Sequence, residues 1–169
     1  MYLYLIQVQE YCCTVLHLCK DNEKEGKMDT KFSVAVHVLI LISEAPNLLN
    51  SDQIAESVGT NASYIRKVLS LLKKSGMIDS HRGVGGYVLT TAPDQITLLG
   101  IYQAVMDEPQ IHLLDIHQNP NAQCVVGRHI KPMLTGMFEG IEKAFARELS
   151  RKTLAECIEA IRAEMSQDV

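Results

Sequence analysis

Tryptophan is absent from the 169-residue sequence, aromatic residues make up only 5% of it, and it contains 10 glycines and 5 prolines. A β sandwich needs many β-favouring aromatics and frequent glycine- and proline-containing turns, so this composition argues against one. Hydrophobic residues at 47% and charged residues at 21% are near the values of globular domains, which excludes general disorder. We therefore predict a folded, mainly helical protein.

An excess of positive charge is also lacking. The chain has 16 lysines and arginines against 20 acidic residues, a formal net charge of −4, so any surface for nucleic acid must be local. Residues 61–91 form such a region, because they carry five basic side chains and Asp79 as the sole acid.

A secretion signal and a membrane-spanning run are missing as well. The apolar stretch 1–19 lacks a basic start and is interrupted by Gln7, Gln9 and Glu10, which is typical of neither. The five cysteines are odd in number and irregularly spaced, which favours reduced thiols. We predict a cytoplasmic protein with no membrane partner.

Residues 1–27 are predicted to be an N-terminal extension, because a charged segment, 21–27, separates them from the apolar pattern that opens at Met28. Two explanations stay open. The codons of residues 24–26 can spell a bacterial ribosome-binding sequence, in which case translation starts at Met28 and the assigned start is wrong. In the other explanation the extension is an amphipathic helix that packs on the domain.

Two helices are predicted between residues 30 and 59. Residues 30–43 are apolar nearly all round and stop before Pro46, as in a buried helix that proline ends. Asn50 and Gln53 then form a capping-box pattern for a short second helix, and Gly59 marks its end.

A third helix follows after a tight turn and completes a helix-turn-helix pattern. Asn61 can cap it and Gly76 marks its end. Its apolar residues recur at i, i+3, i+4 and i+7, at Ile65, Val68, Leu69 and Leu72. Its polar residues are therefore expected to face outward.

A β hairpin is predicted directly after these helices. Residues 77–81 and 87–90 read as strands, and the segment between them is rich in glycine. Three helices followed by a hairpin define a winged helix. The expected fold is mainly α with a small β-hairpin wing, and the winged helix-turn-helix domain spans residues 28–110.

The C-terminal part is predicted to be a linker loop, 111–127, followed by dimerisation helices, 128–169. A long helix in this part carries an apolar stripe that a small domain cannot cover, so we expect it to pair across a two-fold axis. The predicted interface residues are Ile130, Leu134, Met137, Phe138, Ile141 and Phe145. Packing of the stripe against its own domain is the alternative.

Several motifs in residues 28–166 together resemble the Rrf-type family of bacterial winged helix-turn-helix transcriptional regulators. They include Ile54-Ala55-Glu56, Leu72-Lys73-Lys74-Ser75-Gly76-Met77-Ile78 and Gly85-Gly86-Tyr87-x-Leu89. The segment His117-x-Asn119-Pro120-Asn121-x-x-Cys124 is similar to the YwnA-like branch of that family. The resemblance implies DNA contacts by Asn61, Ser63, Tyr64 and Arg66 in the third helix and by Arg82 in the wing.

The chemistry of these side chains agrees with contact to double-stranded DNA. Arg66 can donate a bidentate pair to guanine, Ser63 and Tyr64 can reach base edges or phosphates, and Lys67 supplies positive charge to phosphate. Ordinary solvated polar residues would show the same pattern, and helix capping alone accounts for Asn61.

Cys124 is the single cysteine in the region where cluster-binding relatives in the resembled family place three, so we predict neither an iron-sulfur cluster nor another metal. Its position before the long helix makes it a candidate thiol sensor, because thiols at helix N-termini can be reactive. An inert loop thiol is the alternative. The sequence does not identify a small-molecule or oxidant effector.

Motifs of nucleotide hydrolysis, nucleophilic catalysis, zinc proteolysis and dinucleotide binding are absent from the sequence. We predict no enzymatic activity. The predicted function is sequence-specific transcriptional regulation, as a repressor that binds a palindromic operator as a homodimer. The alternative is a winged helix that docks on another protein without specific DNA binding.

Overall fold

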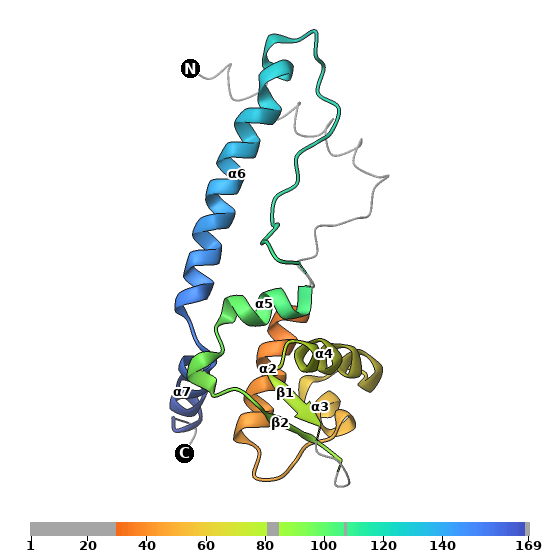
Figure 1. Cartoon of the computed structure of the whole chain (residues 1–169), viewed down its shortest axis with the longest axis vertical. Coiled ribbons are helices and arrows are strands. Elements are labelled where there is room, and N and C mark those ends of the chain that lie inside the picture. Colours follow the sequence, from red (N-terminus) through yellow and green to blue (C-terminus); the bar gives the residue numbers. More distant parts are fainter. Residues whose placement is uncertain (1–29, 81–84, 107, 168–169) are drawn as a thin grey trace, which may run out of the picture.

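The computed structural model describes residues 30–80, 85–106 and 108–167. The predicted extension, 1–27, and the wing residue Arg82 lie outside these residues. A group of short helices and a hairpin forms the lower part of Figure 1, and one long helix rises from it. In chain order the elements are α2 (Lys31–Glu44), α3 (Ser51–Val58), α4 (Ala62–Lys74), β1 (Ile78–Ser80), β2 (Tyr87–Leu89), the 3-10 turn η1 (Pro93–Gln95), α5 (Leu98–Met106), α6 (Val125–Arg151) and α7 (Leu154–Met165).

The predicted capping signals begin α3 and α4 as expected. The Oδ1 atom of Asn50 accepts hydrogen bonds from the backbone N–H groups of Asp52 and Gln53, both at 3.0 Å. The Gln53 side chain accepts from the Asn50 N–H in return, which completes the capping box. Asn61 caps α4 by accepting from the Tyr64 N–H at 2.8 Å. The helix-turn-helix predicted from the sequence is therefore confirmed.

The core of the domain forms around the inward face of α4. Its four predicted stripe residues are between 0% and 1% exposed, and they pack with residues of α2, α3 and α5. Full burial of an aliphatic side chain stabilises a fold by about 1.5–3 kcal/mol. This stripe therefore sets how α4 is rotated about its axis. The stripe consists of Ile65, Val68, Leu69 and Leu72.

The wing is a two-stranded antiparallel hairpin in which Ile78 pairs with Leu89 and Ser80 with Tyr87. Gly86 precedes the second strand with a φ of 148°. A Cβ atom at this position would lie 2.6 Å from the Cβ of Leu48, so only glycine lets the strand approach the loop between α2 and α3.

Helix α7 returns to the winged domain and completes its core. Leu154 is fully buried and Ile158 is 5% exposed. The Leu154 N–H donates to the Ile96 carbonyl at 2.8 Å. At the other end of the helix, the Arg162 guanidinium donates to both carboxylate oxygens of Glu44, at 2.7 and 2.8 Å. Hydrogen bonding to Arg162 lowers the pKa of Glu44.

This arrangement differs from the predicted division of the C-terminal part. The loop predicted as 111–127 ends earlier, because α6 begins at Val125. Within the segment predicted to form dimerisation helices, 128–169, α7 lies against α2 and η1 of its own chain. An apolar stripe alone does not reveal whether the surface that covers it lies in the same chain. In the described ranges, no helix combines the length and the apolar character that a membrane span requires.

The position of α7 generates a prediction about stability. Leu154→Ala leaves a cavity in the core and should lower the free energy of unfolding by about 2–5 kcal/mol. Ile161→Ala removes a side chain that is 41% exposed on the same helix and should cost less than about 1 kcal/mol. Urea denaturation at one fixed protein concentration measures both. Equal small losses would show that α7 does not belong to the core.

Candidate nucleic-acid interface

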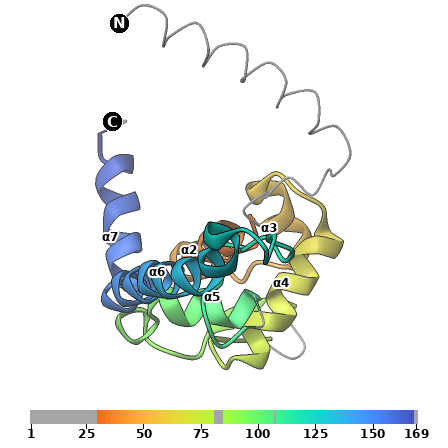
Figure 2. The ribbon, with the colours of Figure 1, turned by 90° about the horizontal axis from the view of Figure 1, so that it is seen from above.

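The outward face of α4 is polar and basic. Figures 1 and 2 both show α4 at the edge of the winged domain, beside α3. The exposed residues of this face follow the helical period on the side away from the buried stripe. They are Ser63, Arg66, Lys67, Ser70, Lys73 and Lys74. This face therefore offers hydroxyl groups and positive charge to a ligand in solvent.

Arg66 is held against α3. Its Nε donates to the Ser51 Oγ at 3.1 Å and its Nη2 donates to the Asp52 Oδ1 at 3.0 Å. The side chains of Arg66 and Asp52 are 55% and 70% exposed. Such an exposed ion pair contributes only about 0–1 kcal/mol to stability. Arg66 therefore stays available to a ligand.

The other sequence-predicted residues of α4 fall into two groups. Ser63 and Lys67 are exposed, and neither side chain has a hydrogen-bond partner within the described residues. Asn61 is occupied as the helix cap, and Tyr64 is half-buried against the core. Asn61 and Tyr64 thus have structural roles in addition to their predicted ones.

The sequence analysis did not single out Ser70, and Lys73 and Lys74 entered it through the local positive charge and a family motif, not as candidate DNA contacts. Ser70 and Lys74 continue the face of Lys67, and their spacing of three and seven residues from it was the available signal. Lys73 links α4 to the hairpin, because its Nζ lies 2.7 Å from both the Ser80 Oγ and the Asp79 Oδ1.

The predicted dimer residues of α6 lie on one face and are largely open to solvent. Met137, Ile141 and Phe145 are 50%, 47% and 38% exposed, whereas Ile130, Leu134 and Phe138 are half-buried. At 100° per residue the six span about 100° of the helix circumference. Within the described residues, α6 buries Leu149 alone.

The loop 108–123 runs beside α6 up to its N-terminal end (Figure 1) and is tied to the helix by Glu142. The Glu142 carboxylate accepts from the backbone N–H groups of Leu113 and Leu114, at 2.8 and 3.3 Å. The Nε2 atom of His112 forms a hydrogen bond of 3.0 Å with the Asp115 Oδ1. This hydrogen bond raises the pKa of His112, and the negative charge of Glu142 acts in the same direction. The sequence contains no periodic signal for such a link between a loop and a distant helix.

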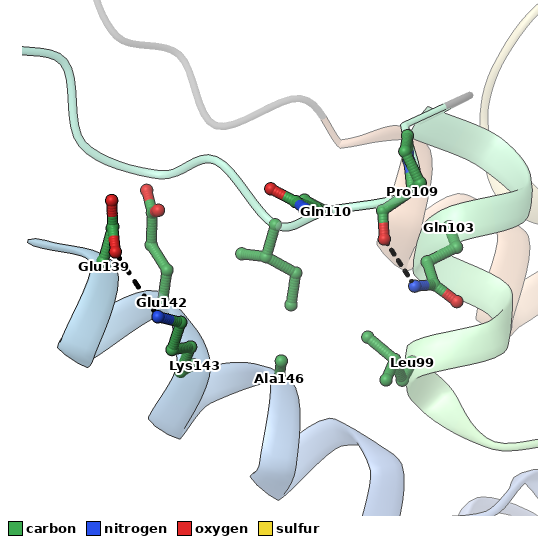
Figure 3. A pocket seen from close by; sticks show the side chains of 9 residues that line it. Leu99, Gln103, Pro109, Gln110, Glu139, Glu142, Lys143 and Ala146 are labelled. Atoms are coloured by element: carbon green, nitrogen blue, oxygen red, sulfur yellow. Dashed lines mark hydrogen bonds and ion pairs between the residues drawn. The ribbon is translucent and has the colours of Figure 1, made fainter.

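An open cavity of about 490 Å³ lies between α5, this loop and α6 (Figure 3). Its apolar floor includes Leu99 and Ala146. Most of the polar groups that line the cavity form hydrogen bonds or ion pairs with one another. The Gln103 amide donates to the Pro109 carbonyl at 2.8 Å, and the Lys143 Nζ lies 3.4 Å from the Glu139 Oε2.

Cys124 lies in the turn that begins α6, at the end of the helix remote from the winged domain (Figure 1). Its thiol is exposed, and its N–H donates to the Asn121 carbonyl at 3.1 Å. Gly127 lets this turn close, because a Cβ there would overlap the Asn121 carbonyl oxygen. In the sequence, Cys124 lies between the winged domain and α6. In space, the length of α6 keeps Cys124 far from α4. Burial raises the pKa of the second described thiol, Cys157.

A metal site would require several ligands to converge. In the described part of the chain, no three His, Cys, Asp or Glu side chains are placed to hold a metal ion. The described thiols, Cys124 and Cys157, lie at the start of α6 and within α7.

A helix-turn-helix pair, a two-stranded wing and an exposed basic second helix define the winged helix-turn-helix class of DNA-binding proteins. The model of the Rrf2 family, described as an iron-dependent transcriptional regulator, matches residues 28–160. The chain belongs to this family. It is a DNA-binding transcriptional regulator and not an enzyme.

The chain is similar to several known sequences and solved structures. It is 39% identical over 127 residues to YwnA of Bacillus subtilis (strain 168), which carries the name of an HTH-type transcriptional regulator, and the match covers 75% of this chain and 93% of YwnA. A crystal structure described as a DNA-binding protein matches with a TM-score of 0.61 and 35% identity, over 76% of this chain and 98% of its own. A transcriptional regulator from Lactobacillus plantarum matches with a TM-score of 0.66 and 25% identity, over 83% and 99%.

The iron in the family's description does not fit the residues that the structure describes. The loop before α6 supplies one thiol, Cys124, and the described side chains contain no group of three metal ligands. An iron-sulfur cluster held by thiolates needs several such ligands together. No step of DNA recognition is therefore assigned to iron.

Proposed function

We propose that the chain is a homodimeric repressor that recognises a palindromic operator through the outward face of α4. The observation that supports this proposal is the placement of Arg66, Lys67 and Ser63 on one exposed face, opposite a fully buried stripe. A dimer bound to an operator within a promoter would exclude RNA polymerase, which accounts for repression without any further activity.

In this proposal α4 enters the major groove, and its residues make different kinds of contact with DNA. Arg66 reads guanine through paired N–H donors, and Lys67 contacts phosphate without selecting sequence. Ser63 and the phenol of Tyr64 add contacts to base edges or phosphates. Asn61 stays the cap of α4 while its amide N–H₂ group faces the DNA backbone. Arg82 in the wing adds a further contact with DNA.

The exposed apolar face of α6 supports the homodimer. A solvent-facing stripe of methionine, isoleucine and phenylalanine is costly in a monomer and is typical of an interface. Pairing of two α6 helices about a two-fold axis would bury Ile130, Leu134, Met137 and their neighbours on this stripe. The same axis makes the preferred DNA site palindromic.

Base recognition is tested by comparing Arg66→Ala with Lys67→Ala. Loss of Arg66 should cost about 1–3 kcal/mol at a preferred site selected from random DNA and less on random DNA, because it removes a base contact. Loss of Lys67 should weaken binding to both DNAs alike and lower the salt dependence. Equilibrium binding at several salt concentrations measures both effects. Equal losses on both DNAs for Arg66→Ala would remove Arg66 from base recognition.

The same salt titration separates DNA binding from the alternative of protein docking. Neutralisation of phosphates makes DNA affinity fall steeply as salt rises. An apolar docking surface would show little salt dependence. DNA binding that is weak, without sequence preference and insensitive to salt would favour the docking module.

Dimer formation is tested by placing charge on the α6 stripe. Leu134→Glu or Phe138→Glu should split the dimer and abolish tight operator binding, since one half-site supplies only part of the affinity. Gly136→Glu is the matched control, because a side chain there meets nothing within 4 Å and lies on another face of the helix. Sedimentation and operator binding measure the outcome. A folded monomer with full operator affinity would contradict the proposal.

We also propose that the regulator responds to thiol oxidation at Cys124. The thiol is exposed at the start of α6, so a sulfenic acid or mixed disulfide there would act on the pairing of the two α6 helices. The signal must pass along 27 helical residues, about 40 Å. Loss of DNA upon titration with peroxide, hypochlorite or a quinone should occur for the wild type and not for Cys124→Ser. Equal losses in both proteins, or in neither, would leave Cys124 as a structural thiol.

A further inference from the structure

One edge of the Arg66 guanidinium is already occupied by α3. The Nε–H and one N–H of Nη2 point in the same direction from the planar group. These two donors meet the Ser51 Oγ at 3.1 Å and the Asp52 Oδ1 at 3.0 Å. The two contacts come from neighbouring residues, so they fix both the position of the guanidinium and the orientation of its plane.

The other edge of the same group is left open. In the described part of the chain no residue accepts a hydrogen bond from Nη1, and Nη2 keeps one N–H that Asp52 does not use. Nη1 and Nη2 together present two parallel N–H donors, the arrangement that matches O6 and N7 of guanine. The contacts with α3 therefore restrain Arg66 without using the donors that would recognise a base.

The residues that hold Arg66 are themselves fixed. Ser51 and Asp52 are the first two residues of α3, and the Asn50 side chain, which caps this helix, accepts a hydrogen bond from the Asp52 N–H at 3.0 Å. Helix α3 also packs against α4, and both helices contribute fully buried side chains to one core. The Asp52 carboxylate thus stands on a rigid support close to the DNA-facing surface.

We propose that Asp52, assisted by Ser51, is a positioning residue that aims Arg66 at the base and thereby sets sequence discrimination. This inference rests on the proposed role of Arg66 in base recognition. A free arginine side chain loses much rotamer freedom when it binds a base, and a side chain that is already restrained loses less. The Asp52 charge has a second effect, because it repels phosphate and lowers affinity for DNA of any sequence.

Asp52 should therefore have two opposite effects. It raises the discrimination between base sequences, and it lowers the affinity for DNA of any sequence. Glu56, a second exposed carboxylate on α3, has no described contact with Arg66 and provides the matched control. Asp52→Ala and Glu56→Ala remove the same charge from the same helix. Only Asp52→Ala removes the support of Arg66, and Asp52→Asn keeps an oxygen acceptor in its place.

The experiment measures the dissociation constants of the full chain for a preferred site and for the same site with guanine replaced by adenine in both half-sites. The ratio of the two constants is the discrimination. Asp52→Ala should lower it by about two- to tenfold while affinity for random DNA rises. Asp52→Asn should retain most of the discrimination, and Glu56→Ala should raise affinity for both sites and leave the ratio unchanged. The double variant of Asp52→Ala with Arg66→Ala should discriminate no worse than Arg66→Ala alone.

Failure of this inference can be distinguished from failure of the proposed role of Arg66. If Arg66→Ala lowers the ratio but Asp52→Ala does not, Arg66 recognises a base without help from α3 and the inference is wrong. If Asp52→Ala lowers the ratio further in the absence of Arg66, Asp52 acts by another route and the inference is also wrong. If Arg66→Ala leaves the ratio unchanged, the proposed role of Arg66 fails and the inference falls with it.

Discussion

The burial of four side chains on α4 sets which residues of this helix face solvent. Ile65, Val68, Leu69 and Leu72 are no more than 1% exposed, and exposing any one of them would cost about 1.5–3 kcal/mol. A rotation of α4 would also bury Arg66 and Lys67, which is costly for charges without partners. The polar face of α4 is therefore a consequence of the core. The surface proposed to meet DNA does not have to be stabilised by its own contacts.

Local signals in the sequence predicted this part of the molecule well. Helical periodicity, the caps at Asn50 and Asn61, and the glycine-rich hairpin act over a few residues, so they can be recognised in the sequence. The contacts that join distant segments could not be predicted in this way. Arg66 meets Asp52 across two helices, Glu142 holds a loop about 28 residues away, and Arg162 reaches Glu44 over a separation of 118 residues. The partner of each charge depends on the folded arrangement, and surface charges offer many partners of equal chemistry.

Among the residues that the structure describes, α6 is coupled to the winged domain at its C-terminal end. Backbone hydrogen bonds join Lys152 to Leu98 at the start of α5 and Leu154 to Ile96 just before it. Helix α7 contributes Leu154 and Ile158 to the core. The base of α6 is therefore fixed relative to α4, whereas the other end, with Cys124, extends away from the domain (Figure 1). In the proposed dimer, pairing of the two α6 stripes would set the separation of the two α4 helices. Small changes in that pairing would affect both half-sites at once.

Selection of bound sequences from random DNA, with the full chain, tests the central claim most directly. The account predicts an enriched inverted repeat whose half-sites contain guanine and whose centres lie about one helical turn, roughly 10–10.5 base pairs, or slightly more apart. This spacing would follow from two α4 helices related by the two-fold axis of an α6 dimer. A pool without enrichment would contradict recognition of sequence by α4, and a single unrepeated motif would contradict the dimer.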